Sequence, residues 1–260
     1  MRKVISFISA AVLLLGMSAC QKKNTVVINS AADLAGKKIG CQAGTTGELY
    51  IQEEVKDAKL KSFKTGIDAS LDLKNGAIDA IVLDELPAKE IVSRNPDLTI
   101  VNDNFMTESY AVAVKKGNTE LLESINKTIA DLKSNGKYEE LIKAFMPVDG
   151  NIVIPEVDEL DTKDIIKMGT NAAFPPFEFI MGTDVVGFDV AIGKLIAKDY
   201  GKKLKVIDMS FDGLIAALQS GAIDFIAAGM TATEERRQNV DFSESYYESN
   251  QVIIVRKTVQ

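Results

Sequence analysis

One stretch of this chain occurs twice, and that repeat limits the fold more than any other feature of the sequence. Residues 73–84 read LKNGAIDAIVLD and residues 218–229 read LQSGAIDFIAAG, and the two align without a gap. In each copy a helical pattern ends at a glycine, Gly76 or Gly221, and an apolar run follows. Glycine favours the left-handed conformation that ends a helix, and a short apolar run is typical of a buried parallel strand. The repeat therefore predicts two related α/β units.

The residues that close the two copies are candidates for one shared site. Asp84 follows the strand of the first copy, and Gly229 follows the strand of the second. Ligands of open α/β sheets bind beyond the carboxyl ends of the strands. We therefore expect both residues to face one cleft.

The remaining patterns complete two α/β lobes. Apolar runs predict further strands over residues 39–42, 110–115, 165–169, 203–207 and 251–256, and helical patterns over 121–135, 138–145 and 189–200. An acidic, proline-containing stretch predicts a linker over residues 147–163. We divide the chain into a leader at 1–20, a small lobe at 21–108 and a large lobe, including the linker, at 109–260.

Composition excludes several kinds of site. The chain has no His, which removes Ser-His-Asp and Cys-His nucleophiles and every His-ligated metal site. Its 30 Lys and Arg against 37 Asp and Glu give a net charge of -7, which argues against a nucleic-acid partner. We therefore expect no metal, no other cofactor and no nucleic acid.

Residues 1–20 resemble a bacterial lipoprotein signal. Arg2 and Lys3 form a basic start, an apolar run follows, and small residues lead to Cys20. The apolar run is too short for a membrane span, which needs about 20 residues. The resemblance implies cleavage before Cys20 and lipidation of its thiol, so that the exported protein is anchored to the membrane and faces the periplasm or the cell exterior. Met17 stands where Leu is usual, which leaves a plain secretory signal as the alternative.

With the Cys20 thiol lipidated, the only other cysteine, Cys41, has no partner for a disulfide. Its neighbours Ile39 and Gly40 are apolar or small. We interpret Cys41 as a small buried hydrophobic residue.

Several motifs in one chain resemble those of polar amino-acid-binding proteins of ABC importers, the bacterial solute-binding proteins of family 3. They are GTNAAFPPFEF at 169–179, GFD at 187–189, FDGLIAALQ at 211–219, GMTATEER at 229–236 and DFSESYY at 241–247. The match extends over nearly all of the chain after residue 20. It implies an α/β, two-lobed periplasmic-binding-protein fold of type II. It also implies a monomer that binds a free amino acid and delivers it to the membrane subunits of an importer.

The order of the motifs differs from the order in that family. Family members begin with the strand predicted here at residues 165–169, whereas here the second lobe comes first. We therefore expect a circularly permuted fold in which the linker 147–163 joins the family's usual termini. Neighbouring termini at the surface make such a rearrangement compatible with one fold. We also expect the crossing near residues 110–115 to be the only covalent one.

The resemblance implies roles for the charged residues. A free amino acid is a zwitterion, so a closed site must supply partners for both backbone charges. Arg236 occupies the position that holds the α-carboxylate in a two-pronged contact, helped by the Thr231 hydroxyl and the backbone at Thr46. Asp84 takes the α-ammonium together with the carbonyl of Gly229. The plain alternatives are a surface ion pair for Arg236 and a helix cap for Asp84.

The resemblance also places the ligand's side chain. Phe174 and Phe211 lie on either side of it, Met230 adds an apolar wall, and Asn171 and Gln42 reach its far end. Because both far-end residues are neutral, the sequence favours a neutral polar amino acid such as Gln or Asn.

An enzyme is the competing class, because dehydratases acting on amino-acid-like substrates share the fold. Such an enzyme needs an acid at the reacting centre, and Asp84 is already assigned to the ammonium. Asp189 follows Gly187 and Phe188 and is interpreted as structural. We therefore expect a binding protein rather than an enzyme.

Overall fold

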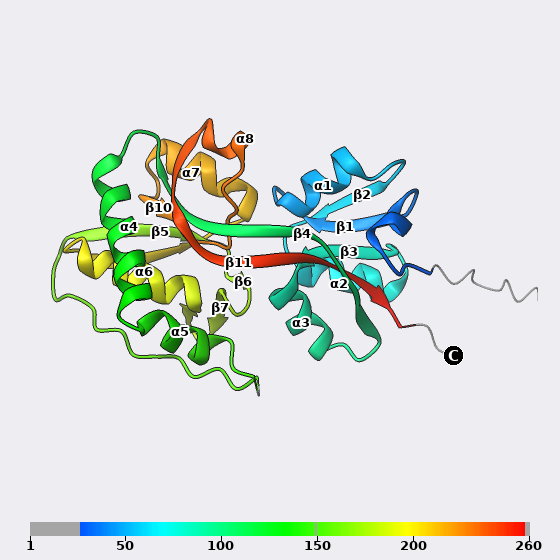
Figure 1. Cartoon of the computed structure of the whole chain (residues 1–260), viewed down its shortest axis with the longest axis horizontal. Helices are drawn as coiled ribbons and strands as arrows, with labels where there is room; N and C mark the ends of the chain where they lie inside the picture. Colours follow the sequence, from blue (N-terminus) through cyan, green and yellow to red (C-terminus); the bar gives the residue numbers. More distant parts are fainter. Residues whose placement is uncertain (1–26, 149, 258–260) are drawn as a thin grey trace, which may run out of the picture.

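The structure is a computed structural model that describes residues 27–148 and 150–257. Two α/β lobes lie side by side and are joined by two long strands (Figure 1). This confirms the two-lobed α/β architecture that the sequence predicts. Both ends of the described chain lie on the outer side of the small lobe (Figure 1).

The small lobe is a parallel sheet covered by helices. Strand β1 lies between β2 and β3 and pairs in parallel with both. Ile39 and Val82 are almost fully buried beneath the helices, since the parallel strands are covered on both faces. Its elements are η1 (Ala31–Leu34), β1 (Lys38–Gln42), α1 (Thr46–Glu54), β2 (Lys59–Phe63), α2 (Gly66–Asn75), β3 (Ala80–Asp84) and α3 (Glu85–Ser93).

The large lobe continues the same sheet and adds a small second one. Strand β5 pairs in parallel with β9 and β10, and β6, β7 and β8 form an antiparallel sheet of their own. Its elements are α4 (Thr119–Ser134), α5 (Lys137–Phe145), β5 (Ile165–Thr170), β6 (Ala173–Phe174), β7 (Glu178–Met181), β8 (Asp184–Val186), α6 (Phe188–Asp199), β9 (Lys203–Asp208), η2 (Phe211–Gly213), α7 (Leu214–Ser220), β10 (Phe225–Ile226) and α8 (Glu234–Arg237).

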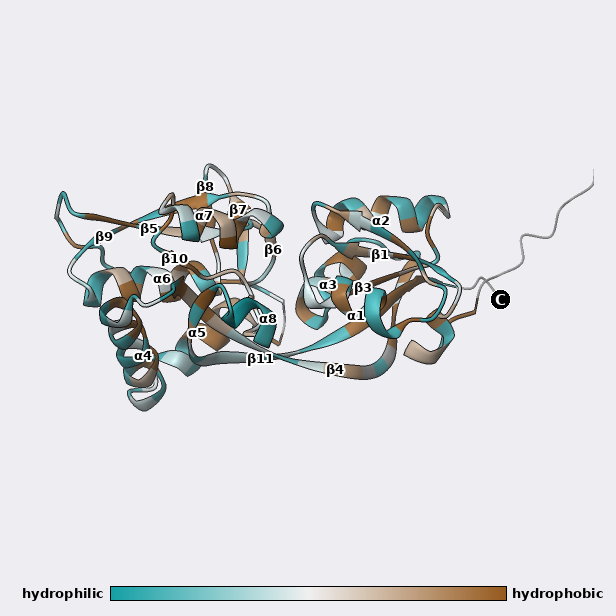
Figure 2. Ribbon diagram, turned by 90° about the horizontal axis from the view of Figure 1, so that it is seen from above, coloured by the Kyte–Doolittle hydropathy of each residue, from teal (hydrophilic) through white to brown (hydrophobic). Residues whose placement is uncertain are grey.

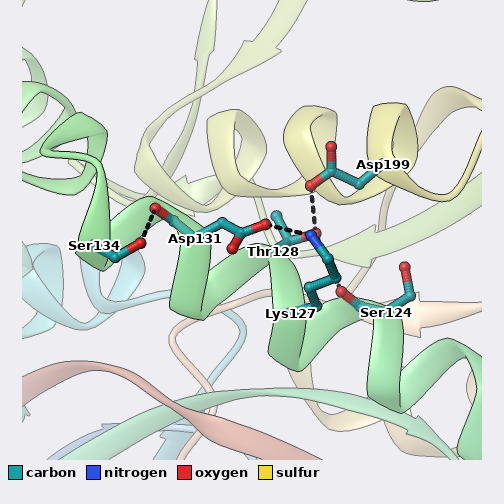
Figure 3. Close-up of polar contacts among 6 residues, drawn as sticks. All are labelled: Ser124, Lys127, Thr128, Asp131, Ser134 and Asp199. Atoms are coloured by element: carbon teal, nitrogen blue, oxygen red, sulfur yellow. Dashed lines mark hydrogen bonds and ion pairs between the residues drawn. The ribbon is translucent and has the colours of Figure 1, made fainter.

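Helices α4 and α6 pack against each other on the large lobe. The buried Thr128 of α4 donates a hydrogen bond from Oγ1 to Oδ2 of Asp199 on α6, over 2.7 Å (Figure 3). Lys127 and Asp131 form an exposed pair on the outer side of α4, which contributes little to stability. The contact through Thr128 fixes how the two helices lie against each other.

Two strands cross between the lobes, whereas the sequence led us to expect a single covalent crossing. Strands β4 (Leu98–Lys115) and β11 (Val240–Arg256) pair with each other antiparallel at the centre of the eight-stranded sheet, and both pass from one lobe to the other (Figures 1 and 2). Residues 251–255 of β11 pair with β3 of the small lobe. The expectation was wrong because Val252, Ile253 and Ile254 are buried in the small lobe and bring the end of β11 there. The lobe boundary between residues 108 and 109 stays a prediction. Strand β11, whose residues this prediction assigns to the large lobe, ends in the small lobe.

The repeat has the structure that the sequence predicts. Helices α2 and α7 end at Gly76 and Gly221, with φ of 76° and 79°, and each is followed by a strand. Strand β10 contains only two residues, because the chain turns away from the sheet toward Gly229. Residues 150–163 of the predicted linker form no helix or strand, and Glu159 lies 3.6 Å from Lys194 of α6.

The predicted leader, including Cys20, lies outside the described residues. Within residues 27–148 and 150–257, none of the helices combines the length and the apolar character that crossing a bilayer requires. Cys41 is fully buried, as predicted, and its thiol donates to the carbonyl of Gly47. Burial raises the pKa of the Cys41 thiol to about 12, so the thiol stays protonated.

Candidate binding site between the lobes

A small cavity lies where the two lobes meet, at the carboxyl ends of strands β1, β3, β5 and β10. It measures about 10 Å³, room for a single water molecule. This is the edge of the sheet at which the sequence predicts a site. The residues that line it are Gln42, Thr45, Thr46, Asp84, Glu108, Asn171, Phe174, Glu178, Phe211, Ala228, Gly229 and Arg236.

The structure brings together nearly all of the residues singled out in the sequence. Met230 and Thr231 are the exceptions and do not line the cavity. Met230 is buried in the core behind Gly229, whereas Thr231 touches Arg236 and Glu108, which do line the cavity. Their contacts with a ligand stay predictions.

Arg236 is buried at the cavity with only 7% of its surface exposed. The Thr233 hydroxyl caps helix α8 by accepting from the Arg236 amide, which fixes where the side chain begins. Its Nη1 donates to the Thr231 carbonyl over 2.7 Å and its Nη2 to the Gly44 carbonyl over 2.8 Å, so the guanidinium bridges the lobes. The guanidinium also lies over the Phe211 ring. Arg236 is therefore a buried cation and not the surface ion pair of the plain alternative.

Asp84 supplies the opposite charge from the small lobe. It stands at the start of α3, but its side chain makes no cap and points into the cavity instead. Gln251 donates to its Oδ1 over 2.6 Å, and the Tyr110 hydroxyl donates to its Oδ2. Burial, and then the charge of Glu108, raise the pKa of Asp84 well above its usual range. A cation beside Asp84 would offset both effects.

Gly229 must be glycine at this point of the chain. Its φ is 53°, and a Cβ there would lie 2.9 Å from a ring carbon of Phe174. The Gly229 amide donates to Oδ2 of Asp189 over 2.8 Å, and the Tyr246 hydroxyl donates to the same oxygen. Asp189 therefore holds the loop at Gly229 in place, which agrees with its interpretation as structural.

The two neutral residues assigned to the far end of the ligand touch each other across the lobes. Gln42 donates from Nε2 to Oδ1 of Asn171 over 2.9 Å, and both are buried. Asn171 in turn donates to the Met209 carbonyl. The pair therefore presents only neutral amide groups to the cavity.

The sequence does not identify two carboxyl groups that line the cavity. Glu108 lies on β4 and is 3% exposed, and Glu178 on β7 is 1% exposed. Burial, and then the charge of Asp189, raise the pKa of Glu178 well above its usual range. Glu178 stands inside a quoted motif, but nothing in the sequence says which way its side chain points. Glu108 lies in a polar stretch without any period that would mark it.

Residues 166–260 match the family described as bacterial extracellular solute-binding proteins, family 3. The matched segment contains most of β5, all of β10 and α8, and several residues that line the cavity, among them Asn171, Gly229 and Arg236.

Residues 166–260 of the chain thus match family 3 of the bacterial extracellular solute-binding proteins, and the chain is similar to members of that family. That family is one of binding proteins rather than enzymes, as the sequence predicts.

Individual relatives agree with this match. The chain is 47% identical over 90 residues to the arginine-binding extracellular protein ArtP of Bacillus subtilis, covering 35% of each chain. It is 32% identical over 136 residues to the L-cystine-binding protein TcyJ of Escherichia coli, covering 52% of this chain and 51% of the relative. A solved structure, the arginine-bound form of domain 1 from TmArgBP, is 42% identical with a TM-score of 0.32, covering 39% of this chain and 87% of that one. The chain thus spans between a third and about half of the length of these two curated relatives.

Proposed function

We propose that this protein binds a free amino acid between its lobes and delivers it to the membrane subunits of an ABC importer. One observation carries the proposal: a buried guanidinium and a buried carboxyl group, Arg236 and Asp84, line the same cavity from different lobes. Burying a charge is costly unless a partner compensates it. The two backbone charges of an amino acid are a complementary pair of partners.

In the proposed complex the lobes close on the amino acid backbone. Arg236 receives the α-carboxylate with the help of Thr231 and the start of α1 at Thr46, where free amide groups favour an anion. Asp84 receives the α-ammonium together with the Gly229 carbonyl. Each charge contacts the ligand from its own lobe, so the ligand favours the closed arrangement over an open one.

The ligand's side chain lies between Phe174 and Phe211 in this proposal and ends at Gln42 and Asn171. The neutral amide pair favours a neutral polar amino acid such as Gln or Asn. Glu108 favours a second candidate, a cationic amino acid, because it adds a second carboxylate to a cavity with one arginine. Several relatives are named for binding arginine, which also favours this candidate.

Calorimetric titration with Gln, Asn, Arg, Lys, Glu and Asp tests the proposal. We expect Gln or Asn to bind most tightly, because the cavity offers their side-chain amides neutral partners. If Arg or Lys binds most tightly, the ligand is the cationic candidate and not a neutral amino acid. Binding of none of the common amino acids would contradict the proposed function itself.

We also propose that the protein is anchored to the membrane by lipid on Cys20. It then works as a monomer that faces the periplasm or the cell exterior. The basic start and short apolar run before Cys20 support this proposal. We expect the full-length protein to fractionate with membranes and the Cys20→Ser variant to be released. A soluble wild-type protein with a free Cys20 thiol would contradict the anchor.

We further propose that the chain is a circular permutation of the family's usual order. The segment that matches the family model ends the chain, and the small lobe with β1 and β3 precedes it. Both described ends lie on the outer side of the small lobe (Figure 1), which supports a rearrangement that keeps the fold.

A further inference from the structure

A single carboxylate joins the two lobes beside the cavity. Glu108 lies on the crossing strand β4 and is 3% exposed. The Thr46 hydroxyl donates to its Oε1, and the Thr231 hydroxyl donates to its Oε2 over 2.8 Å. Thr46 begins α1 in the small lobe, whereas Thr231 follows β10 in the large lobe. Both carboxylate oxygens are therefore held, one by each lobe.

The Thr231 hydroxyl also belongs to the proposed binding site of the ligand's α-carboxylate, and Thr46, whose backbone amide belongs to that site, places its hydroxyl beside it. A threonine hydroxyl has a single proton and donates it to one acceptor at a time. Thr231 can therefore donate to Glu108 or to the ligand, and the same holds for the hydroxyl of Thr46. Two carboxylates at one seat also repel each other in a buried site.

We propose that Glu108 is an internal competitor of the ligand: its carboxylate occupies the hydroxyls of Thr46 and Thr231 and holds the lobes together until the ligand's α-carboxylate replaces it. This inference rests on the proposed function. It makes Glu108 a residue that sets affinity for every amino acid alike, because all of them carry the same α-carboxylate.

The contacts of Arg236 favour competition over a counter-charge role for Glu108. Among the described residues Glu108 forms no ion pair, and the Nη atoms of Arg236 donate to backbone carbonyls instead. The charge of Glu108 acts on Asp84, whose pKa it raises in addition to the effect of burial. Glu108 thus adds negative charge at the place where a carboxylate has to bind, and this charge also partly offsets the lowering of the Arg236 pKa by burial.

The test measures the affinity of purified protein for glutamine and for arginine in Glu108→Ala and Glu108→Gln variants. We expect Glu108→Ala to bind whichever of the two the wild type binds, and both if it binds both, roughly tenfold more tightly, which corresponds to about 1.4 kcal/mol. Glu108→Gln keeps one acceptor and should lie between this variant and the wild type. Ser109→Ala is the matched control, since Ser109 is the next residue on β4 and contacts Glu248 outside the cavity.

A double-mutant cycle separates competition from a general change of the site. In a Thr46→Val, Thr231→Val background, Glu108→Ala should bring a much smaller gain, because the contested hydroxyls are gone and only the repulsion between the two carboxylates is relieved. Without ligand, small-angle scattering should give a larger radius of gyration for Glu108→Ala than for the wild type, because the contact between the lobes is lost.

Three results would decide against the proposal while the proposed function stands. They are unchanged or weaker binding in both folded Glu108 variants, a loss of affinity confined to arginine, and a gain of undiminished size without the two hydroxyls. The second result would make Glu108 a counter-charge for a cationic side chain. If the wild type binds no amino acid at all, the proposed function fails and not this step alone.

Discussion

Replacing Arg236 by Ala should weaken amino-acid binding by roughly thirty-fold to several thousand-fold. Truncating one partner of a desolvated charge pair costs about 2 to 5 kcal/mol, and about 1.4 kcal/mol corresponds to a factor of ten. Arg236→Lys should recover part of the affinity, because lysine restores the positive charge but lacks the planar guanidinium group that contacts a carboxylate through two hydrogen bonds. Arg237→Ala is the matched control, since Arg237 is the exposed neighbour on α8. Calorimetry with the tightest-binding amino acid measures all three variants.

Asp84→Ala should weaken binding by a similar factor, because the α-ammonium then loses its anionic partner in a buried site. The adjacent Glu85→Gln is the control, since Glu85 pairs with Lys89 on the surface of α3. If both Arg236→Ala and Asp84→Ala bind the amino acid as tightly as the wild type does, the proposed contacts of Arg236 and Asp84 with the ligand's two backbone charges are wrong.

Asp189 should make the free energy of unfolding fall as the pH rises from about 4 to about 6. Burial raises the pKa of Asp189 from 3.8 to about 6 in the folded protein. Between these values the folded protein holds a proton that the unfolded chain has lost, so raising the pH favours unfolding. The shift corresponds to about 3 kcal/mol. Asp84 and Glu178 act in the same direction, because burial also raises the pKa of each.

Urea unfolding at a series of pH values measures this dependence. In Asp189→Asn the decline between pH 4 and 6 should be smaller by the part due to Asp189. Asp241 has the opposite sign: hydrogen bonds from Gly117 and Lys116 lower the pKa of Asp241, so its contribution is lost only as the pH falls below its usual range. An unfolding free energy that rises between pH 4 and 6 in the wild type would contradict the prediction.

The local structure of the repeat could be predicted because every step of it has a local cause. Gly76 and Gly221 end their helices in the left-handed conformation, and apolar runs follow as strands. The positions of Asp84 and Gly229 at one cavity follow from the rule for the carboxyl ends of strands.

The two crossing strands could not be predicted at their full length. The sequence indicates only residues 110–115 and 251–256, whereas β4 and β11 cover Leu98–Lys115 and Val240–Arg256. The added residues mix buried apolar side chains such as Leu98, Val240 and Tyr246 with polar ones, and no single alternating pattern runs through them. Glu108 lies among them, and its burial depends on the lobes that meet around it.

The pairing of the two crossing strands has a mechanical consequence. Residues 247–251 of β11 pair in unbroken register with residues 106–110 of β4, and register shifts flank this segment between Ser245 and Tyr247 and between Gln251 and Ile253. Such irregularities are where a ribbon bends, whereas a regular ladder resists bending. The regularly paired segment of the two strands is therefore expected to stay stiff, and the strands are expected to bend at the register shifts on either side of it. Glu108 pairs with Ser249 in the middle of this stiff segment, so it keeps its position when either lobe rotates about the register shift on its own side.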